Sequence, residues 1–184
     1  MKRLIILLLI INSCSAPKEL VHDPYSVIND FLKDTSGLKV VSKPLTTIAE
    51  VSVIKTEFLS KQESKIKLIA KELKEPDVES IRQQFERGQG FNTMPLMKYG
   101  YEIIPKSVLN IKSVNDSLTW KSINAQFGND IVSFDMPIFN KKGDRAYLKV
   151  EFICGIKCGK GQTVILNKEN EKWTISNIGS IWVN

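Results

Sequence analysis

The sequence has little of the side-chain chemistry on which most familiar enzymes and metal sites depend. Its 184 residues include one histidine, which excludes metal sites built from several histidines, and three cysteines, which are too few for a dense disulfide scaffold. The unbroken apolar run near the amino terminus, residues 4–11, holds only eight residues, whereas a membrane-spanning helix needs about 20. We therefore interpret this run as a targeting segment and not as a spanning helix.

The composition is otherwise that of an ordinary globular protein. With 42% hydrophobic and 25% charged residues, the chain lies outside the disordered and fibrous classes. Its length suits one domain of ordinary size, and no internal repeat or low-complexity tract divides it. We expect a single folded domain over residues 23–184.

The amino terminus has the pattern of a secretory signal. Lys2 and Arg3 precede the apolar run, and Asn12, Ser13 and Cys14 follow it. We expect residues 1–13 to be a signal peptide that is removed, and residues 14–22 to be a tether. The alternative is an ordinary signal peptide that is cleaved elsewhere, with Cys14 incidental.

Residues 11–14, Ile-Asn-Ser-Cys, resemble the bacterial lipobox, in which an aliphatic, a variable and a small residue precede the cysteine that receives lipid. The resemblance implies cleavage before Cys14 and attachment of acyl chains to it, and several such chains together hold a protein stably on a membrane. No aspartate follows Cys14, so the inner-membrane retention signal of enteric bacteria is missing. We expect a lipid-anchored protein of the bacterial cell envelope, at the outer membrane.

The charge of the chain gives no support to nucleic-acid binding. Loss of Lys2 and Arg3 from the 26 basic residues leaves 24, against 20 acidic ones. Between residues 55 and 75, lysines and glutamates alternate, which is typical of a solvated helix face rather than of a one-signed binding stripe. We therefore expect no nucleic-acid partner.

Helical patterns come first along the chain. Asp23 and Pro24 predict a helix start with an apolar stripe, and Pro76 and Asp77 predict another helix that ends at Gly88. Residues 47–73 fit two helices or one long one, although residues 51–59 also alternate as a strand does. A short strand at 38–41 and a helix from 115 to 128 complete this part.

After residue 128 the hydrophobic period changes to two. Half-buried strands are predicted at 132–136 and 146–154, and further strands at 163–167, 172–177 and 180–183. Short turns between them favour an antiparallel meander, since parallel pairs need long crossovers. The predicted fold class is α+β: N-terminal helices packed on a C-terminal antiparallel β-meander, with the strand-rich part at residues 131–184.

Two cysteines remain besides Cys14, and they are four residues apart. In an exported protein, Cys154 and Cys158 form an even pair in an oxidising compartment. An extended strand would hold them too far apart to bond, so we expect a turn at this point, closed by a Cys154–Cys158 disulfide. The alternative is a redox-active pair, although three residues between the cysteines do not match the thioredoxin-type spacing.

The carboxyl-terminal part has a second resemblance, carried by residues 134–139 (Phe-Asp-Met-Pro-Ile-Phe), the Cys-Gly pairs at 154 and 158, Lys172-Trp173 and Trp182. It resembles a recurring module of small uncharacterised bacterial lipoproteins, in which serine often replaces Asp135. The resemblance implies the fold and the location and adds no chemistry.

Candidates for a functional site are few. His22 precedes a helix cap and is expected to be a solvent-exposed residue, not a catalytic one. Among the carboxylates of the strand-rich half (Asp130, Asp135, Asp144 and Glu151), Asp135 is the hardest to explain structurally. Trp182 alternates against Ile181 and Val183, so it is either covered by a helix or displayed to a partner, if those two are core.

These observations predict a lipid-anchored envelope protein with a binding or assembly role. We expect a membrane contact through Cys14, an envelope protein or a glycan as partner, and no cofactor or metal. Trp182 and Asp135 are the candidate binding residues. The alternatives are a carboxylate-dependent envelope hydrolase, and a cystatin-like or NTF2-like ligand-binding or inhibitor module, which rests on fold analogy alone.

Overall fold

A computed structural model describes residues 22–34, 46–48, 58–88, 91–104, 117–128, 131–155 and 158–183. The helices are α1 (Pro24–Asp34), α2 (Phe58–Glu72), α3 (Val78–Arg87), the 3-10 helix η2 (Met94–Tyr99) and α5 (Ser117–Phe127). The strands are β1 (Thr46–Ile48), β2 (Glu102–Ile104), β3 (Ile131–Phe134), β4 (Ile138–Phe139), β5 (Arg145–Gly155), β6 (Cys158–Glu169) and β7 (Lys172–Val183). In the described ranges, no helix combines the length and the apolar character needed to cross a membrane.

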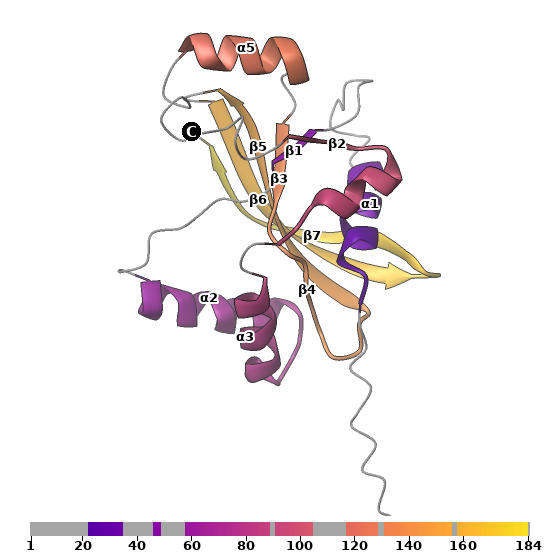
Figure 1. Ribbon diagram of the computed structural model, residues 1–184. Helices are drawn as coiled ribbons and strands as arrows, with labels where there is room; N and C mark the ends of the chain where they lie inside the picture. Colours follow the sequence, from indigo (N-terminus) through magenta and orange to yellow (C-terminus); the bar gives the residue numbers. More distant parts are fainter. Residues whose placement is uncertain are drawn as a thin grey trace, which may run out of the picture.

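The structure confirms the predicted α+β class. Helices precede an antiparallel run of strands β3-β5-β6-β7, in which each hairpin turn is short (Figure 1). The full sheet order is β2-β1-β3-β5-β6-β7, and β4 continues the β3 side of β5. The prediction missed the two short strands β1 and β2, which pair in parallel, as do β1 and β3.

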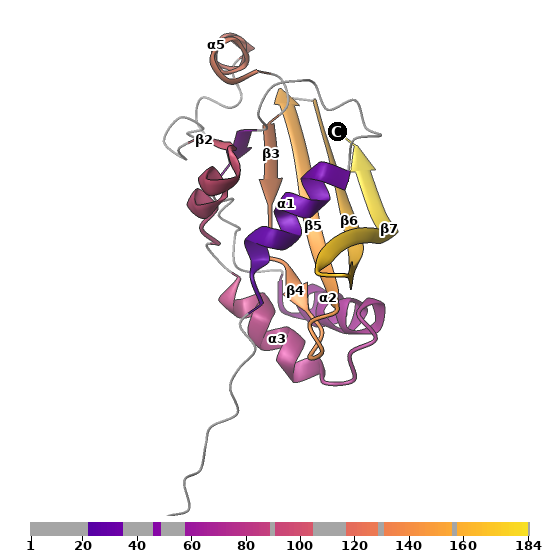
Figure 2. The ribbon, with the colours of Figure 1, turned by 90° about the vertical axis from the view of Figure 1, so that its right-hand side faces the viewer.

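One face of the sheet carries a continuous apolar core. Helix α1 lies across this face (Figure 2), and its buried stripe consists of the residues that the helical period predicted. Phe31 meets Phe134 edge-on at a centroid distance of 6.3 Å. The main buried members are Val27, Ile28, Phe31, Leu32, Leu96, Val132, Phe134, Phe139, Ala146, Leu148, Val150, Val164, Leu166 and Trp173.

The other face carries two separate apolar clusters. At one end, α2 and α3 cover Tyr147, Ile165 and Ile138. At the other end, Trp120 and Ile123 of α5 pack with Ile131 and Ile104. Figure 1 shows α5 and the α2–α3 pair at opposite ends of the sheet, with the middle of β5 and β6 between them.

The helix ends follow the predicted capping chemistry. The Tyr25 backbone N–H donates to Asp23 Oδ1 at 3.0 Å, and the Glu79 and Ser80 N–H groups donate to Asp77 Oδ1 at 3.1 Å each. Gly128 follows α5 with φ +87°, a left-handed conformation that favours glycine at this position.

Some predicted elements need correction. The strand at 132–136 is not half-buried, because all four residues of β3 are buried, Ser133 included. Gly179 does not separate two strands, since β7 runs on to Val183, with one register shift across Gly179, between Ile178 and Ile181, and another at Ser176. Residues 38–41, 51–57 and 115–116 lie outside the described residues.

Candidate functional site

Charged side chains occupy the middle of the second face, between its two apolar clusters. They are Asp135, Lys149 and Glu151, with Lys65 of α2 close enough to interact electrostatically with all three. We call these four residues the charged strip. Lys149 and Glu151 come from β5, where alternation places them on the same side as Tyr147 and opposite to the buried Leu148 and Val150.

Lys149 is the centre of the charged strip. Its Nζ lies 2.5 Å from Glu151 Oε1 and 3.9 Å from Asp135 Oδ2. The Lys149 and Glu151 side chains are 27% and 20% exposed, so water screens their attraction less than it would at an open surface. The two carboxylates therefore converge on one ammonium group.

The environment changes the proton affinity of three groups around the charged strip. Burial opposes the charge on Lys149, but Asp135 and Glu151 outweigh it and raise the lysine pKa. For Lys65 burial prevails and lowers the pKa, with the ammonium lying 4.9 Å from the Phe85 ring centre. Burial, helped by the charge of Asp135, raises the pKa of Tyr147 to about 12.

A bulge positions Asp135. Phe134 pairs with Val150 and Ile138 pairs with Tyr147, so three residues of the β3–β4 side face two residues of β5. The Asp135 backbone N–H still donates to the Lys149 carbonyl at 3.2 Å. Pro137 lies in this interruption, and such bulges are common where a side chain is aimed at a site.

Trp182 lies on the same face as the charged strip. A Cβ added to Gly161 would overlap the indole of Trp182, so the ring rests directly on this glycine. Glu151 pairs with Gly161, and Gly161 pairs with Trp182, which places all three in one row across the sheet. The missing side chain at Gly161 leaves the space that the ring occupies.

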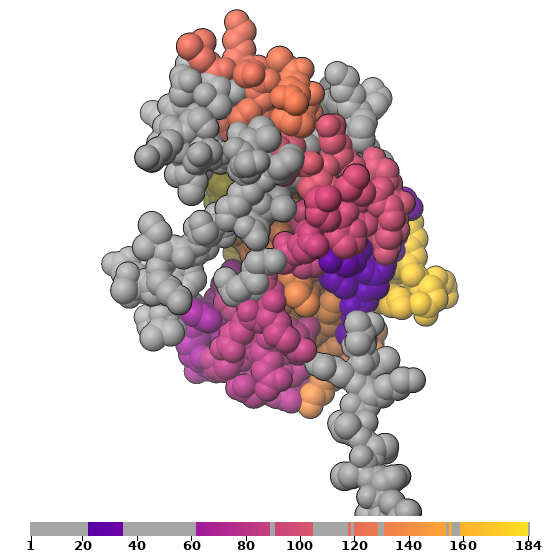
Figure 3. All heavy atoms as spheres, viewed as in Figure 1, coloured from indigo at the N-terminus to yellow at the C-terminus, as the bar shows by residue number. Residues whose placement is uncertain are grey.

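The two predicted binding residues therefore lie on one surface. Asp135 is connected to it by its ion pair with Lys149, and Trp182 stands in the same cross-strand row as Glu151. In the space-filling view of Figure 3, atoms of the later strands are visible in a recess between α5 and α2. Trp182 is 38% exposed, which leaves part of its ring accessible to a ligand.

The expectations for Ile181 and Val183 need a correction that bears on Trp182. Both were considered as core, but they are 63% and 76% exposed. No helical cover of Trp182 is needed to explain its place, because its ring packs on the sheet itself.

The remaining candidate residues have different environments in the structure. Asp144 accepts from the Asn140 side-chain amide at 2.7 Å within the β4–β5 turn, as a structural residue does. Glu151 is half-buried and pairs with Lys149. His22 is not simply solvent-exposed: its ring lies 4.9 Å from that of Phe139, and burial lowers its pKa. Asp130 lies outside the described residues.

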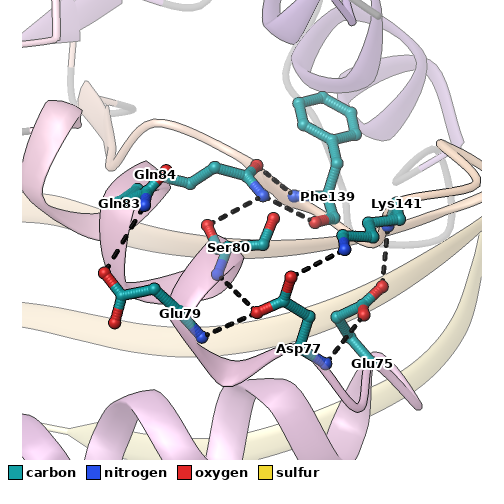
Figure 4. A network of polar contacts seen from close by, with 8 residues as sticks. All are labelled: Glu75, Asp77, Glu79, Ser80, Gln83, Gln84, Phe139 and Lys141. Atoms are coloured by element: carbon teal, nitrogen blue, oxygen red, sulfur yellow. Dashed lines mark hydrogen bonds and ion pairs between the residues drawn. The ribbon is translucent and has the colours of Figure 1, made fainter. Parts of the chain in front are cut away.

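A second polar network fastens α3 to the sheet (Figure 4). The Gln84 amide bonds both backbone groups of Phe139, accepting from its N–H and donating to its carbonyl at 2.9 Å each. Glu75 accepts from the Asp77 and Lys141 backbone N–H groups, and Asp77 pairs with Lys141 Nζ at 2.7 Å. Every one of these contacts ties elements of the fold together, so we assign the network a structural role.

The predicted turn between Cys154 and Cys158 is present as the β5–β6 hairpin, in which Gly155 pairs with Cys158. Their side chains lie outside the described part, so the disulfide stays a prediction. Cys14 and the tether before residue 22 also lie outside it.

The sequence interpretation missed Lys65, Lys149 and Gly161 as parts of the site. Lys149 alternates with core residues on β5, which is the signal that could have paired it with Glu151. Gly161 gave no signal, because its role depends on a residue 21 positions later in the chain.

Comparison with protein-family models, curated proteins and solved structures finds no significant match to this chain.

Proposed function

We propose that this chain is a lipid-anchored protein of the bacterial cell envelope that binds an envelope glycan on the charged strip and Trp182. One observation carries the proposal: a partly exposed indole and the half-buried Lys149–Glu151 pair share the middle of the second sheet face. Such a surface offers an apolar platform beside hydrogen-bonding groups, which is how binding sites combine affinity with orientation.

The chemistry of the surface supports a neutral, polyhydroxylated ligand. The charged strip has two carboxylates and two ammonium groups, so it has no net charge with which to select an ion. An indole offers a flat apolar face to the C–H face of a sugar ring, while Lys149 and Glu151 can donate to and accept from hydroxyl groups.

The position of the first described residue is compatible with anchoring through Cys14. His22 packs on Phe139 and over Gly143, at the end of the molecule that carries α3 and β4. Residues 14–21 reach at most about 3.6 Å each, or roughly 30 Å in all. In this arrangement the end of the molecule with α5 is the one farther from the membrane (Figure 1).

Tryptophan fluorescence tests the ligand part. Trp120 and Trp173 are 5% and 3% exposed, so iodide quenches Trp182 almost alone. Soluble peptidoglycan fragments and outer-membrane oligosaccharides should protect this fluorescence at saturating concentration. By titration calorimetry, which does not depend on the fluorophore that they lack, Trp182→Ala should lose binding and Trp182→Phe should keep part of it because a ring remains.

Two controls separate the site from the fold and from the anchor. Glu171→Gln changes an exposed carboxylate that pairs with Lys168 away from the charged strip, and it should leave binding unchanged. Cys14→Ala should move the protein from the membrane fraction to the soluble fraction without changing glycan binding. Unchanged fractionation would reject the anchor, and glycan binding of equal affinity in Trp182→Ala, measured by titration calorimetry, would reject the site.

A carboxylate-dependent hydrolase is the second candidate, because Asp135 and Glu151 converge on Lys149. Glycoside cleavage needs two carboxyl groups that flank the scissile bond. The Lys149 ammonium lies between these two, within 3.9 Å of each, and this ranks binding above catalysis. Release of reducing ends from the same glycans, lost in both Asp135→Asn and Glu151→Gln, would reverse that ranking.

A further inference from the structure

The carboxyl-terminal half of β7 is an exposed sheet edge without charge. Among the strands that the structure describes, β7 is the last in the sheet order, and the pairing along it involves β6 on one side. All residues from 176 to 183 are exposed, and no charged residue occurs in the sequence from Trp173 to the end of the chain. We call residues 176–183 the open edge.

The first half of the same strand is protected. The backbone N–H groups of Trp173 and Ile175 donate to Asp30 Oδ2 at 3.0 Å and Asp34 Oδ2 at 3.2 Å. These carboxylates of α1 occupy donors that another strand would otherwise use. Helix α1 is the helix that packs against β7, and it does so over this first half (Figure 2).

The open edge lacks two of the usual defences of an edge strand. Natural sheets discourage pairing between molecules by placing charged residues or proline on their edges. The open edge has neither, and Ile178, Ile181 and Val183 are 51%, 63% and 76% exposed. Its register shifts twist the strand, which shortens the stretch that can pair continuously and gives more weight to burial of these side chains.

We propose that the open edge binds the open edge of a second copy of this chain, antiparallel, so that the two sheets join at β7. An interface between identical surfaces must be complementary to itself. An uncharged strand meets this condition, because antiparallel pairing with its own copy brings no like charges opposite each other. The open edge has no charged side chain that could pair with an acidic or a basic partner strand.

The size of the interface determines where pairing occurs. A segment of eight residues buries less than the roughly 1,200 Å² of a stable standard interface, so the pairing is weak in dilute solution. Confinement to a membrane raises the effective concentration and favours it. The pairing does not require the anchor, however, because the edge belongs to the folded domain.

Photo-crosslinking of the full chain in whole cells tests this inference. A photo-reactive residue is placed at position 181 in an epitope-tagged chain that is co-expressed with a second chain carrying a different tag. We expect an adduct of twice the chain mass that contains both tags. The matched control is position 97 in η2, where Met97 is 56% exposed, and we expect no such adduct there.

A charge variant gives the complementary result. In the charge variant, Ile181→Lys is added to both chains and the photo-reactive residue is moved to position 183. The yield of the double-tagged adduct should fall about tenfold or more, because two apolar contacts are lost and two like charges enter the same interface. Met97→Lys should leave it unchanged. Thermal unfolding and iodide protection of Trp182 report whether Ile181→Lys is folded.

Every other pattern of adducts overturns the inference. An adduct with a different protein at position 181 would assign the open edge to that protein. Equal double-tagged adducts from positions 97 and 181 would show contact without specificity, and no adduct from 181 or 183 would show an edge that stays unpaired. Glycan binding by Ile181→Lys is a separate readout, so failure of self-pairing does not count against the proposed function.

Discussion

The two faces of the sheet differ in how completely they are filled. The face under α1 is one apolar core from β3 to β7, whereas the opposite face has apolar clusters only at its ends and the charged strip between them. The core side chains of the first face are buried, and the second face leaves its central row of residues available. In this molecule, stability comes chiefly from one face, and the chemistry that a ligand could use lies on the other.

The largest effect should follow from a cavity in the filled face. Leu148 is fully buried in the core under α1, and Leu148→Ala should lower the free energy of unfolding by about 2–5 kcal/mol. Urea denaturation followed by far-UV circular dichroism measures it. The exposed Leu68→Ala is the control and should change stability little. Equal losses in the two variants would contradict the burial of Leu148 in this core.

The next effect concerns the helical cover of the second face. Gln84→Ala removes both bonds to the Phe139 backbone and should cost about 1–3 kcal/mol. Gln84→Glu keeps the size but cannot donate to the Phe139 carbonyl once ionised. Its unfolding midpoint in urea should therefore recover as the pH falls through the range in which glutamate is protonated. If the stability lost in Gln84→Glu does not depend on pH, the missing donor to the Phe139 carbonyl is not the cause of the loss.

A smaller effect on stability but a clear effect on binding is expected at Gly161. In Gly161→Ala the new Cβ displaces the indole of Trp182, whose side chain can rotate away from the sheet. Iodide quenching should rise and glycan binding should fall, while the unfolding midpoint changes modestly. Gly100→Ala is unsuitable as a control because of its φ of +88°, so Ser176→Ala, farther back on β7, serves instead. Unaltered quenching would mean that the ring does not rest on Gly161.

The smallest effect concerns His22, at the edge of the filled face. Burial, with a contribution from Lys168, lowers its pKa below 6.5. The folded protein therefore binds this proton less readily than the unfolded chain, and its contribution to stability is present above pH 6.5 and is lost as the pH falls toward the folded-state pKa. Because the chain has one histidine, its imidazole signals in an NMR titration are assigned without ambiguity. A midpoint at or above 6.5 would contradict the packing of His22 on Phe139.

The sequence predicted the face under α1 better than it predicted the second face. Periodicity found the stripe of α1 and the alternation of β5, because both depend on residues close together in the chain. It did not find β1 and β2, which are three residues each and exist through parallel pairing with distant partners. Alternation also predicted that one face of β3 is open to solvent, but Ser133 on that face is buried. Burial on both sides depends on tertiary contacts, which alternation does not encode.

The candidate site could be proposed from the sequence as a pair of residues but not as a surface. Asp135 and Trp182 were distinguishable by their neighbours in the sequence, but their connection passes through Lys149, Glu151 and Gly161. Cross-strand register decides which residues stand in one row, and the register shifts in β7 change that row in a way that no local pattern specifies.

The hydrogen bond from Trp173 to Asp30 joins residues that are 143 positions apart. The hairpins β5–β6 and β6–β7 are local in the chain and can form early, whereas α1 is synthesised first and binds the strand that is synthesised last. Its apolar stripe therefore has no complete docking site until nearly the whole chain is available. Folding of this domain brings the first described helix onto the last described strand, and a chain that stops short of β7 leaves α1 without part of its docking surface.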